Sequence, residues 1–488
     1  MALKFSVLLL ASVAASPTVA QAAPKHAAHH APAAVQSDAQ KLALLFQQDA
    51  RREKQLNPLE AIYRGEPANP DLVTQLFTEA LDRKVAASAR QSIAALARID
   101  RARLTSEQQI SYDVFAGDKR QELEFEQPDV LALTAVRPMN HFGGIHVEFP
   151  SLVAAGGSLP YNTEADYRTA LNVIRAIPRV LDNGIARFRQ GQASGVVESK
   201  MTVTNMLGQI DALLAQKVED SPFTSPVKEF PAAVPASARP QLQAAYLRAV
   251  RDEVMPAYRR LRTYLHDEYL PSARDAVGLS AMKGGPGLYR RLITAHTTLK
   301  LEPEAVHELG LSEVARIQRE MDQVKDELGY SGSLREFFDY IRTNPRFHPK
   351  TADELSHGFA QIAKTVDAQI PRYFARVPKT PLEIQPYPAY REKYEAGGSY
   401  NQGSADGTRP GVFFYNTYDL PSRFLTGMTT LYLHEAIPGH HFQISLAQEN
   451  TAVPEFQRFG GNTAFVEGWA LYAETLGYPM GLYKDPMQ

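Results

Sequence analysis

The sequence has 488 residues, 44% of them hydrophobic, so it is long enough to bury a large core or to form more than one lobe. Its 52 basic and 54 acidic residues leave a formal net charge of −2, which gives no indication of a nucleic-acid or membrane-surface binder. The absence of cysteine excludes disulfides, thiol catalysis, a lipid-linked cysteine and a cysteine-bound metal.

The first residues predict export. Lys4 precedes a short apolar run, and Ala20 and Ala22 form a small-x-small cleavage pattern, so residues 1–22 are typical of a secretory signal peptide. The apolar run is too short to span a bilayer. Residues 23–38 have the composition of a flexible leader. We therefore expect a periplasmic or secreted protein with no membrane contact after signal cleavage, and one domain over residues 39–488.

The remaining pattern is mainly that of helices. Apolar residues recur at three- and four-residue spacing, as expected for amphipathic helices, over residues 39–123, 164–216, 242–270 and 305–328. Glycines and prolines predict irregular structure over residues 127–162 and a turn over residues 284–289. The proline-rich stretch 221–240 predicts a connector between helices of one unit.

One short aromatic strand is predicted over residues 409–416. An exposed strand edge beside a catalytic helix can pair with a peptide backbone, but the strand can equally pack beneath the site, and both interpretations stay open. Candidate substrate contacts in and after this strand are Tyr415, Asn416, Tyr418 and Arg423. Except for Asn416, they are also candidates for stabilising an oxyanion.

A metal site is predicted around His434 and Glu435. In the HExxH motif the two histidines are four residues apart on one helix face, with the glutamate as general base. Here the fourth position is Pro438, and His440 follows at the sixth. Proline in a helix removes a hydrogen bond and clashes with the carbonyl four residues back, and Gly439 allows backbone angles closed to other residues. We therefore expect a break that absorbs two residues and brings His440 to the metal.

The remaining ligands are sought nearby. His441 lies seven residues after His434 and stays an alternative to His440, because that spacing shares a face on a straight helix. A second helical stretch carries Glu467 and Glu474 on one face. Glu467 is the preferred third ligand, and Glu474 is placed to orient a ligand histidine through its other ring nitrogen. Two neutral imidazoles and one carboxylate form the ligand set of a catalytic Zn²⁺ that keeps one position for water.

Several segments resemble a bacterial family known as domain of unknown function 885, which is grouped with gluzincin-related HExxH metallopeptidases. They are Asp406–Gly411, Asn416–Thr417, His434–Gln443, Glu467–Glu474 and, less closely, Pro286–Met321. The resemblance implies a mainly helical, zincin-like fold with a small β element beside the active-site helix and a cleft between helical lobes. It also implies that the family continues beyond Pro486, so we expect this chain to be truncated at its C-terminus.

Carried over by residue, the resemblance assigns zinc binding to His434, His440 and Glu467, and the general base to Glu435. His441, Glu474 and Gln443 are supporting residues or alternative ligands. The expected function is hydrolysis of peptide bonds by a zinc metallopeptidase. The alternatives are a catalytically incomplete zinc-binding or peptide-binding helical scaffold, and a metal-dependent hydrolase of other amides or esters.

Overall fold

The computed structural model describes residues 36–389 and 391–488. The predicted signal peptide, and all but the last three residues of the predicted leader, lie outside the described residues. From Asp38 to Gln488 the chain forms one compact unit. Among the described helices, none combines the length and the apolar composition that a membrane span requires.

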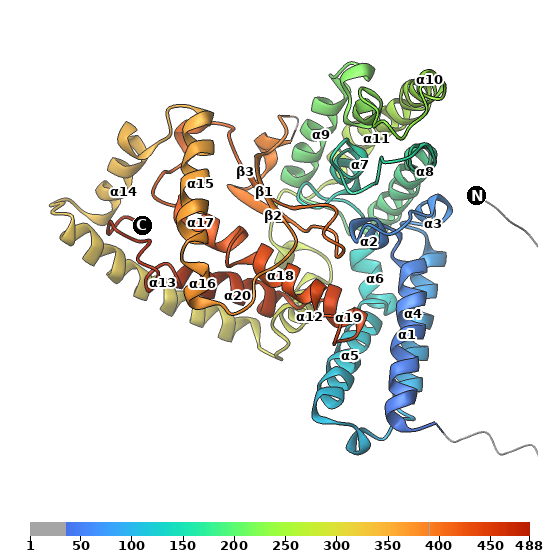
Figure 1. Cartoon of the computed structure of the whole chain (residues 1–488), viewed down its shortest axis with the longest axis horizontal. Helices are drawn as coiled ribbons and strands as arrows, with labels where there is room; N and C mark the ends of the chain where they lie inside the picture. The colour runs from blue at the N-terminus through green and yellow to red at the C-terminus, as the bar shows by residue number, and fades with distance from the viewer. Residues whose placement is uncertain (1–35, 390) are drawn as a thin grey trace, which may run out of the picture. The chain divides into compact units, whose positions relative to one another are not determined.

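The first half of the described chain is built from helices alone (Figure 1). Its α-helices are α1 (Asp38–Leu56), α2 (Pro58–Tyr63), α3 (Pro70–Val73), α4 (Glu79–Leu96), α5 (Ser106–Phe125), α6 (Pro128–Thr134), α7 (Ile145–Val153), α8 (Glu164–Ser194), α9 (Lys200–Leu214), α10 (Arg239–Ala249) and α11 (Met255–Thr263). Short 3₁₀ or π turns join them: η1 (Arg101–Arg103), η2 (Val218–Asp220), η3 (Pro222–Val227), η4 (Val250–Val254), η5 (Tyr264–Tyr269) and η6 (Leu270–Ser272).

Local signals explain where the longest of these helices begin and end. The side chain of Thr163 accepts a hydrogen bond from the backbone of Asp166, and the Asp166 side chain accepts one from the backbone of Thr163, which forms a capping box at the start of α8. Helix α8 ends at Ser194, and Gly195 follows with a φ of 75°, in the left-handed region that glycine adopts without strain. The helices predicted over residues 39–123 and 164–216 are confirmed: the first stretch forms α1 to α5, and the second forms α8 and α9.

Two stretches predicted to be irregular contain helices instead. Helices α6 and α7 lie within residues 127–162, and the predicted turn at residues 284–289 is the start of α12 (Gly285–Thr297). In α6 and α12 a proline stands in the first turn of the helix, where its missing N–H costs nothing. In α7, Pro150 is tolerated inside a short helix. The glycines and prolines therefore marked helix starts as well as loops.

The second half adds a small sheet to further helices. After η7 (Leu279–Ala281) and α12 come α13 (Pro303–Glu327), α14 (Leu334–Thr343), η8 (Pro345–Phe347), α15 (Ala352–Asp367) and α16 (Ile370–Tyr373). The strands are β1 (Leu382–Pro386), β2 (Gly398–Asn401) and β3 (Gly411–Tyr415), with η9 (Glu392–Tyr394) between the first two. The chain ends with η10 (Leu420–Ser422), α17 (Met428–Glu435), α18 (His440–Glu449), α19 (Glu455–Phe459) and α20 (Thr463–Thr475).

The sheet corrects the strand prediction. Strand β3 is the predicted aromatic strand, but it lies in the centre of the order β1-β3-β2, parallel to β1 and antiparallel to β2. Both of its edges are therefore paired, so β3 cannot accept a further strand. The edge that contacts α17 belongs to β2.

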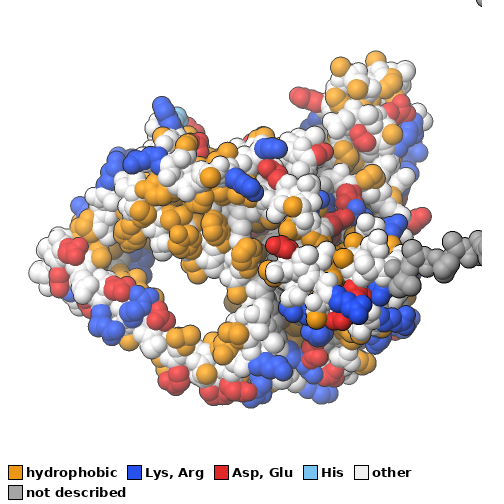
Figure 2. All heavy atoms as spheres, turned by 60° about the horizontal axis from the view of Figure 1, so that its bottom comes forward, with side chains coloured by type: hydrophobic (Ala, Val, Ile, Leu, Met, Phe, Trp, Pro, Cys, Tyr) orange, Lys and Arg blue, Asp and Glu red, His pale blue; other side chains and the backbone are white. Residues whose placement is uncertain are grey.

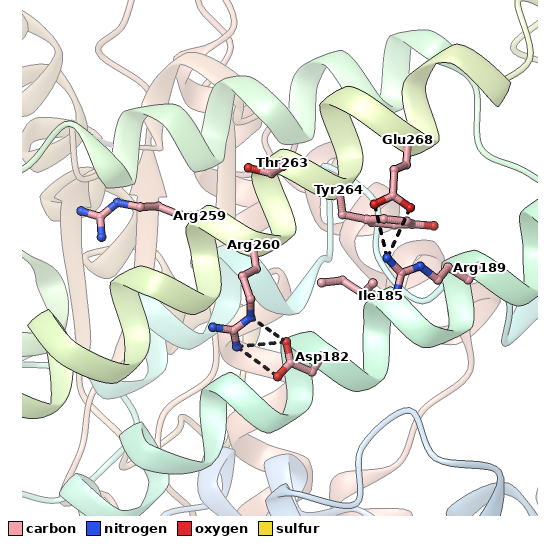
Figure 3. A pocket seen from close by; sticks show the side chains of 8 residues that line it. All are labelled: Asp182, Ile185, Arg189, Arg259, Arg260, Thr263, Tyr264 and Glu268. Carbon is pink, nitrogen blue, oxygen red and sulfur yellow. Dashed lines mark hydrogen bonds and ion pairs between the residues drawn. The ribbon is translucent and has the colours of Figure 1, made fainter.

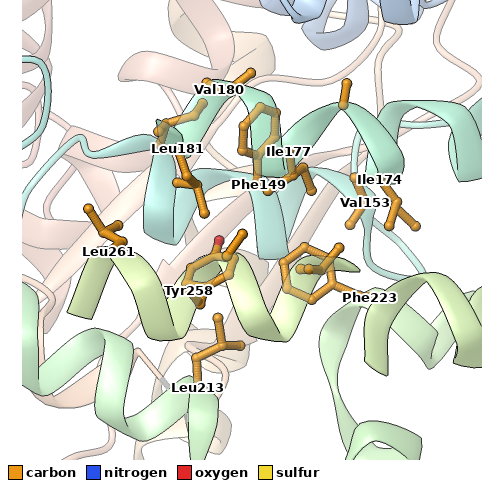
Figure 4. Close-up of a cluster of buried hydrophobic side chains, with 14 of the residues drawn as sticks. Phe149, Val153, Ile174, Ile177, Val180, Leu181, Leu213, Phe223, Tyr258 and Leu261 are labelled. Carbon is orange, nitrogen blue, oxygen red and sulfur yellow. The ribbon is translucent and has the colours of Figure 1, made fainter. Parts of the chain in front are cut away.

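Separate hydrophobic clusters lie under the two halves. The largest includes Phe149, Leu181, Phe223 and Tyr258, all fully buried, which come from α7, α8, η3 and α11 (Figure 4). A second cluster joins α15, β3, α17 and α18 through side chains such as Phe359, Phe413, Tyr432 and Phe442. This second core fixes the helices and the sheet that surround the predicted metal ligands.

One part of the second half has little packing behind it. Helix α13 contains no buried residue, and its apolar side chains Leu309, Val314 and Ile317 are exposed. On α20, Phe465, Leu471 and Tyr472 are also exposed. A space-filling view shows hydrophobic side chains gathered around a hollow on this face (Figure 2).

Candidate metal centre

The predicted helix break is present between His434 and His440. Helix α17 ends at Glu435, the backbone of Ala436 leaves helical angles with φ −106° and ψ −105°, and α18 begins at His440. Pro438 stands between the two helices, where no backbone N–H is needed. The six-residue spacing of the histidines is therefore divided over two helices.

Gly439 is required at the break because of space. Its backbone angles are φ −76° and ψ −130°. A Cβ atom at this position would lie 1.9 Å from the carbonyl oxygen of His434 and 2.3 Å from that of Leu433. Only a residue without a side chain allows α18 to start so close to the end of α17.

The break brings three potential ligands together. The rings of His434 and His440 lie 4.8 Å apart between centroids, almost perpendicular to each other. Glu467 Oε2, from α20, lies 3.5 Å from His434 Nε2 and 3.7 Å from His440 Nε2. All three donor atoms lie within 4.8 Å of one another. Helices α17, α18 and α20, which supply these donors, pack against one another (Figure 1).

These separations fit a small cation with nitrogen and oxygen ligands. With Zn–N and Zn–O bonds of about 2.0–2.2 Å, donors around a tetrahedral zinc lie about 3.3–3.6 Å apart. The Glu467 distances match that range closely. Burial lowers the pKa of His440, so its imidazole is neutral at pH 7, as a metal ligand must be. The three residues therefore fit Zn²⁺ by geometry and by donor type.

A second carboxylate orients the imidazole of His434 through its Nδ1. This Nδ1 lies 2.8 Å from Oε1 of Glu474, which is on α20 two helix turns after Glu467. A carboxylate on Nδ1 fixes the tautomer that leaves the lone pair on Nε2 for a metal. Trp469 also ties α20 to the break, because its Nε1 donates a 2.8 Å hydrogen bond to the carbonyl of Pro438.

Glu435 faces the cluster without joining it. Its side chain is 8% exposed, and burial, supported by the nearby Glu467 carboxylate, raises its pKa to about 7, against the opposing effect of His434. Its carboxylate also accepts a hydrogen bond from the backbone N–H of Tyr400, on strand β2. A carboxyl group with a pKa near neutrality is suited to accept and return a proton.

His441 has a different role from His440. It is 2% exposed, and its Nδ1 lies 3.1 Å from the hydroxyl of Tyr400. Gly411 on β3 makes room for this contact, since a Cβ there would lie 2.4 Å from the Tyr400 hydroxyl and 2.8 Å from His441 Nδ1. Tyr400 thus links β2 to α18 by its side chain and to Glu435 by its backbone. Sequence reasoning missed Tyr400, because Gly398–Asn401 carries no recognisable motif.

The predicted substrate contacts separate into two groups. Tyr415 is 3% exposed and bonded to Ser356, so its side chain supports the fold. Asn416 is 2% exposed, and its amide donates hydrogen bonds to backbone carbonyls of residues 392–396. These two side chains cannot contact a substrate. Tyr418 and Arg423 lie on the loop between β3 and α17, where they are at least partly open to solvent.

The remaining supporting candidate, Gln443, faces α20. Its Nε2 donates a 3.3 Å hydrogen bond to the carbonyl of Phe465, and its buried Oε1 has no hydrogen-bond partner. In the structure it joins α18 to α20.

A cavity of about 510 Å³ lies away from this cluster, between α8 and the helix formed by α11 and η5 (Figure 3). Arg260 and Arg189 in its lining are paired with Asp182 and Glu268, respectively. None of the predicted site residues lines it. We therefore do not assign it to the predicted chemistry.

The comparisons with known proteins agree with the mainly helical prediction and identify the family. Residues 58–488 match the family described as bacterial protein of unknown function (DUF885), and the chain belongs to that family. The resemblance seen in the motifs is thereby confirmed at the level of the family. None of the curated proteins compared with this chain matches it.

Two solved structures share the fold. A candidate lipoprotein from Colwellia psychrerythraea superposes with a TM-score of 0.80 at 23% identity, covering 93% of this chain and 80% of its own. A candidate lipoprotein of unknown function from Shewanella oneidensis gives a TM-score of 0.54 at 17% identity, with the same coverage. At these identities the similarity establishes the architecture of helices with one small sheet, and no activity.

Proposed function

We propose that this chain is an exported, zinc-dependent peptidase. The observation that carries the proposal is the convergence of His434, His440 and Glu467 at metal-ligand separations, with the buried carboxyl of Glu435 beside them. Structural ion-pair clusters also perturb pKa values, but they rarely combine two imidazoles, a carboxylate and an adjacent unliganded glutamate.

A bound Zn²⁺ would supply Lewis acidity and a water of lowered pKa. Glu435 has the position and the raised pKa to take a proton from that water and to deliver it to the leaving amine. Glu474 holds His434 in the tautomer that presents Nε2 to the site. The backbone N–H of Tyr400 holds the carboxylate of Glu435 in place.

Strand β2 supports a peptide as substrate. In the antiparallel pair with β3, the N–H of Asn416 bonds to the carbonyl of Gly397, so the backbone groups of Gly398 and Tyr400 point away from β3. The N–H of Tyr400 faces Glu435, so the backbone groups of this edge that are left for a peptide are those of Gly398 and the carbonyl of Tyr400. An extended peptide can add to such an edge and present its backbone to the site.

Export is part of the same proposal. It is supported by the signal-like pattern of residues 1–22 and by the description of the Colwellia relative as a candidate lipoprotein. We propose a periplasmic or secreted location for the mature chain.

The direct test compares hydrolysis by the zinc-loaded protein and its Glu435→Gln variant on a mixed peptide library, read by mass spectrometry. We expect cleavage by the parent, and a loss of turnover of about 10²–10⁴-fold in the variant with zinc retained, because the variant loses only its base. Glu383→Gln, on the exposed part of β1, is the matched control and should cleave normally.

Two results would change the proposal. Normal turnover by Glu435→Gln would remove the base assignment. A zinc-loaded parent that cleaves no peptide in the library would remove the peptidase proposal, and a zinc-binding helical scaffold would then be the better description.

A further inference from the structure

Arg423 lies beside the beginning of strand β2. A Cβ atom on Gly397, the residue before β2, would be 3.9 Å from Arg423 Nη1, so the guanidinium lies against the backbone at the beginning of the strand. Its Nε donates a 3.2 Å hydrogen bond to the carbonyl of Tyr418. Among the described residues, no carboxylate lies within ion-pair distance of Arg423. Its charge is therefore oriented but not neutralised.

The loop that carries Arg423 is held firmly on both sides. Asn416 bonds to the carbonyls of Glu395 and Ala396, which lead into β2, and its Oδ1 accepts a hydrogen bond from the backbone of Tyr418. Nδ1 of His348 bonds to the carbonyl of Arg423 itself, at 2.8 Å. Since these contacts tie residues 416–423 to the beginning of β2, Arg423 keeps a fixed place relative to the strand edge.

The direction of a bound peptide follows from strand geometry. Antiparallel pairing is the commoner and slightly more stable way to add a strand. In that orientation the scissile bond lies beside Tyr400, next to Glu435, and the later residues of the peptide run back along β2 toward Gly397. Tyr400 and Gly397 are three residues apart, or about 10 Å along a strand. A peptide with two or three residues after the scissile bond would therefore end near Arg423.

We propose that Arg423 binds the C-terminal carboxylate of a peptide, so that this site removes a di- or tripeptide from the C-terminal end of its substrate. The inference rests on the proposed peptidase function and names the substrate class within it. A guanidinium pairs with a carboxylate through two parallel, charge-assisted hydrogen bonds, which an amidated C-terminus cannot form.

The first test measures binding without turnover. Zinc-loaded Glu435→Gln protein is titrated with one hexapeptide in two forms, with a free C-terminal acid and with a C-terminal amide. We expect about tenfold tighter binding of the acid form. Adding Arg423→Ala should reduce the affinity for the acid to that for the amide, while Arg423→Lys should retain part of the preference. Arg335→Ala, on the exposed part of α14, is the matched control and should change neither affinity.

The second test follows the products. The protein with its own Glu435 should release di- or tripeptides from the acid form and little from the amide, and Arg423→Ala should remove this difference. Equal binding of the two forms, equal weakening of both by Arg423→Ala, or internal cleavage that ignores the C-terminus would overturn the inference. Because the binding test needs no turnover, an inactive protein would count against the proposed function alone.

Discussion

Three side chains at or beside the candidate centre have a partner that fixes their orientation, whereas Nδ1 of His440 is buried without a partner among the described residues. His434 is held by Glu474, Glu435 by the backbone of Tyr400, and His441 by the Tyr400 hydroxyl. Binding sites gain affinity when their ligands are oriented before the metal or the substrate arrives. The side chains around the cluster are therefore as important to the proposal as the three predicted ligands.

Replacing Glu474 tests this orientation. In Glu474→Ala the imidazole of His434 loses its Nδ1 partner, so we expect zinc affinity to fall by about 10–100-fold while the fold is kept. Competition with a chelating indicator measures the affinity. Thr475→Ala, the exposed neighbour on the same helix, is the control. Equal affinities for the two variants would show that Glu474 does not support the site.

A carboxyl group outside the site gives a prediction about pH. Glu126 follows the last turn of α5, its Oε2 is buried without a hydrogen-bond partner, and burial together with nearby Asp82 raises its pKa to about 7. The folded chain therefore holds this proton between about pH 4.5 and 7, where the unfolded chain has released it, so the free energy of unfolding falls as pH rises through that window.

Glu126→Gln should remove this loss. The side chain is partly exposed, so the expected gain at pH 8 is only about 1–2 kcal/mol after allowance for solvent screening, and it should vanish near pH 4. Urea unfolding of both proteins at the two pH values measures it. A gain of the same size at both pH values would mean that protonation is not the cause.

At the scale of elements, the break between α17 and α18 is the feature that the sequence could predict best. Pro438 and Gly439 forced the expectation of two helices, and the distance between His434 and His440 depends on that break. The close approach of Gly439 to two carbonyls was not predicted, because it can be seen only in three dimensions.

Gly439→Ala is the sharpest test of the break. The new methyl group would lie 1.9 Å from a backbone oxygen, so the start of α18 must move, and we expect a destabilisation of about 2 kcal/mol together with weakened zinc binding. Gly427→Ala, at the start of α17, is the control because a Cβ there meets nothing within 4 Å. If Gly439→Ala binds zinc and unfolds like the parent, the break does not depend on this close contact.

The sheet could not be predicted from sequence in the same way. Strands β1 and β2 have only five and four residues, and β2 consists of Gly398, Ser399, Tyr400 and Asn401, which show no apolar alternation. Their place is set by pairing with β3: β2 joins it through the loop that follows in the sequence, and β1 pairs with it in parallel, with β2 between them in the sequence. Helices α6 and α7 were missed for a related reason, because tertiary packing overrides the weak local preference of a proline- and glycine-containing segment.

At the scale of the whole molecule, the candidate centre belongs to the second half of the chain. Its ligands come from α17, α18 and α20, over the hydrophobic cluster that contains Phe413 and Phe442. The first half meets this half through polar contacts, such as the hydrogen bond from Arg409 to the carbonyl of Tyr63, and through Phe456, which packs against Phe46 and Phe115. Length and periodicity predicted the helical class. That α20 joins α17 and α18 at one site, from about thirty residues later in the chain, was predicted only from the spacing of the histidine and glutamate motifs.

The measurement that tests the central claim most directly is the zinc content of the purified protein, determined by mass spectrometry for the parent, His440→Ala and His441→Ala. We predict about one zinc per chain in the parent, its loss in His440→Ala, and its retention in His441→Ala, because the two neighbouring histidines face different partners. Zinc lost in His441→Ala but retained in His440→Ala, or no zinc in any of the three proteins, would contradict the account.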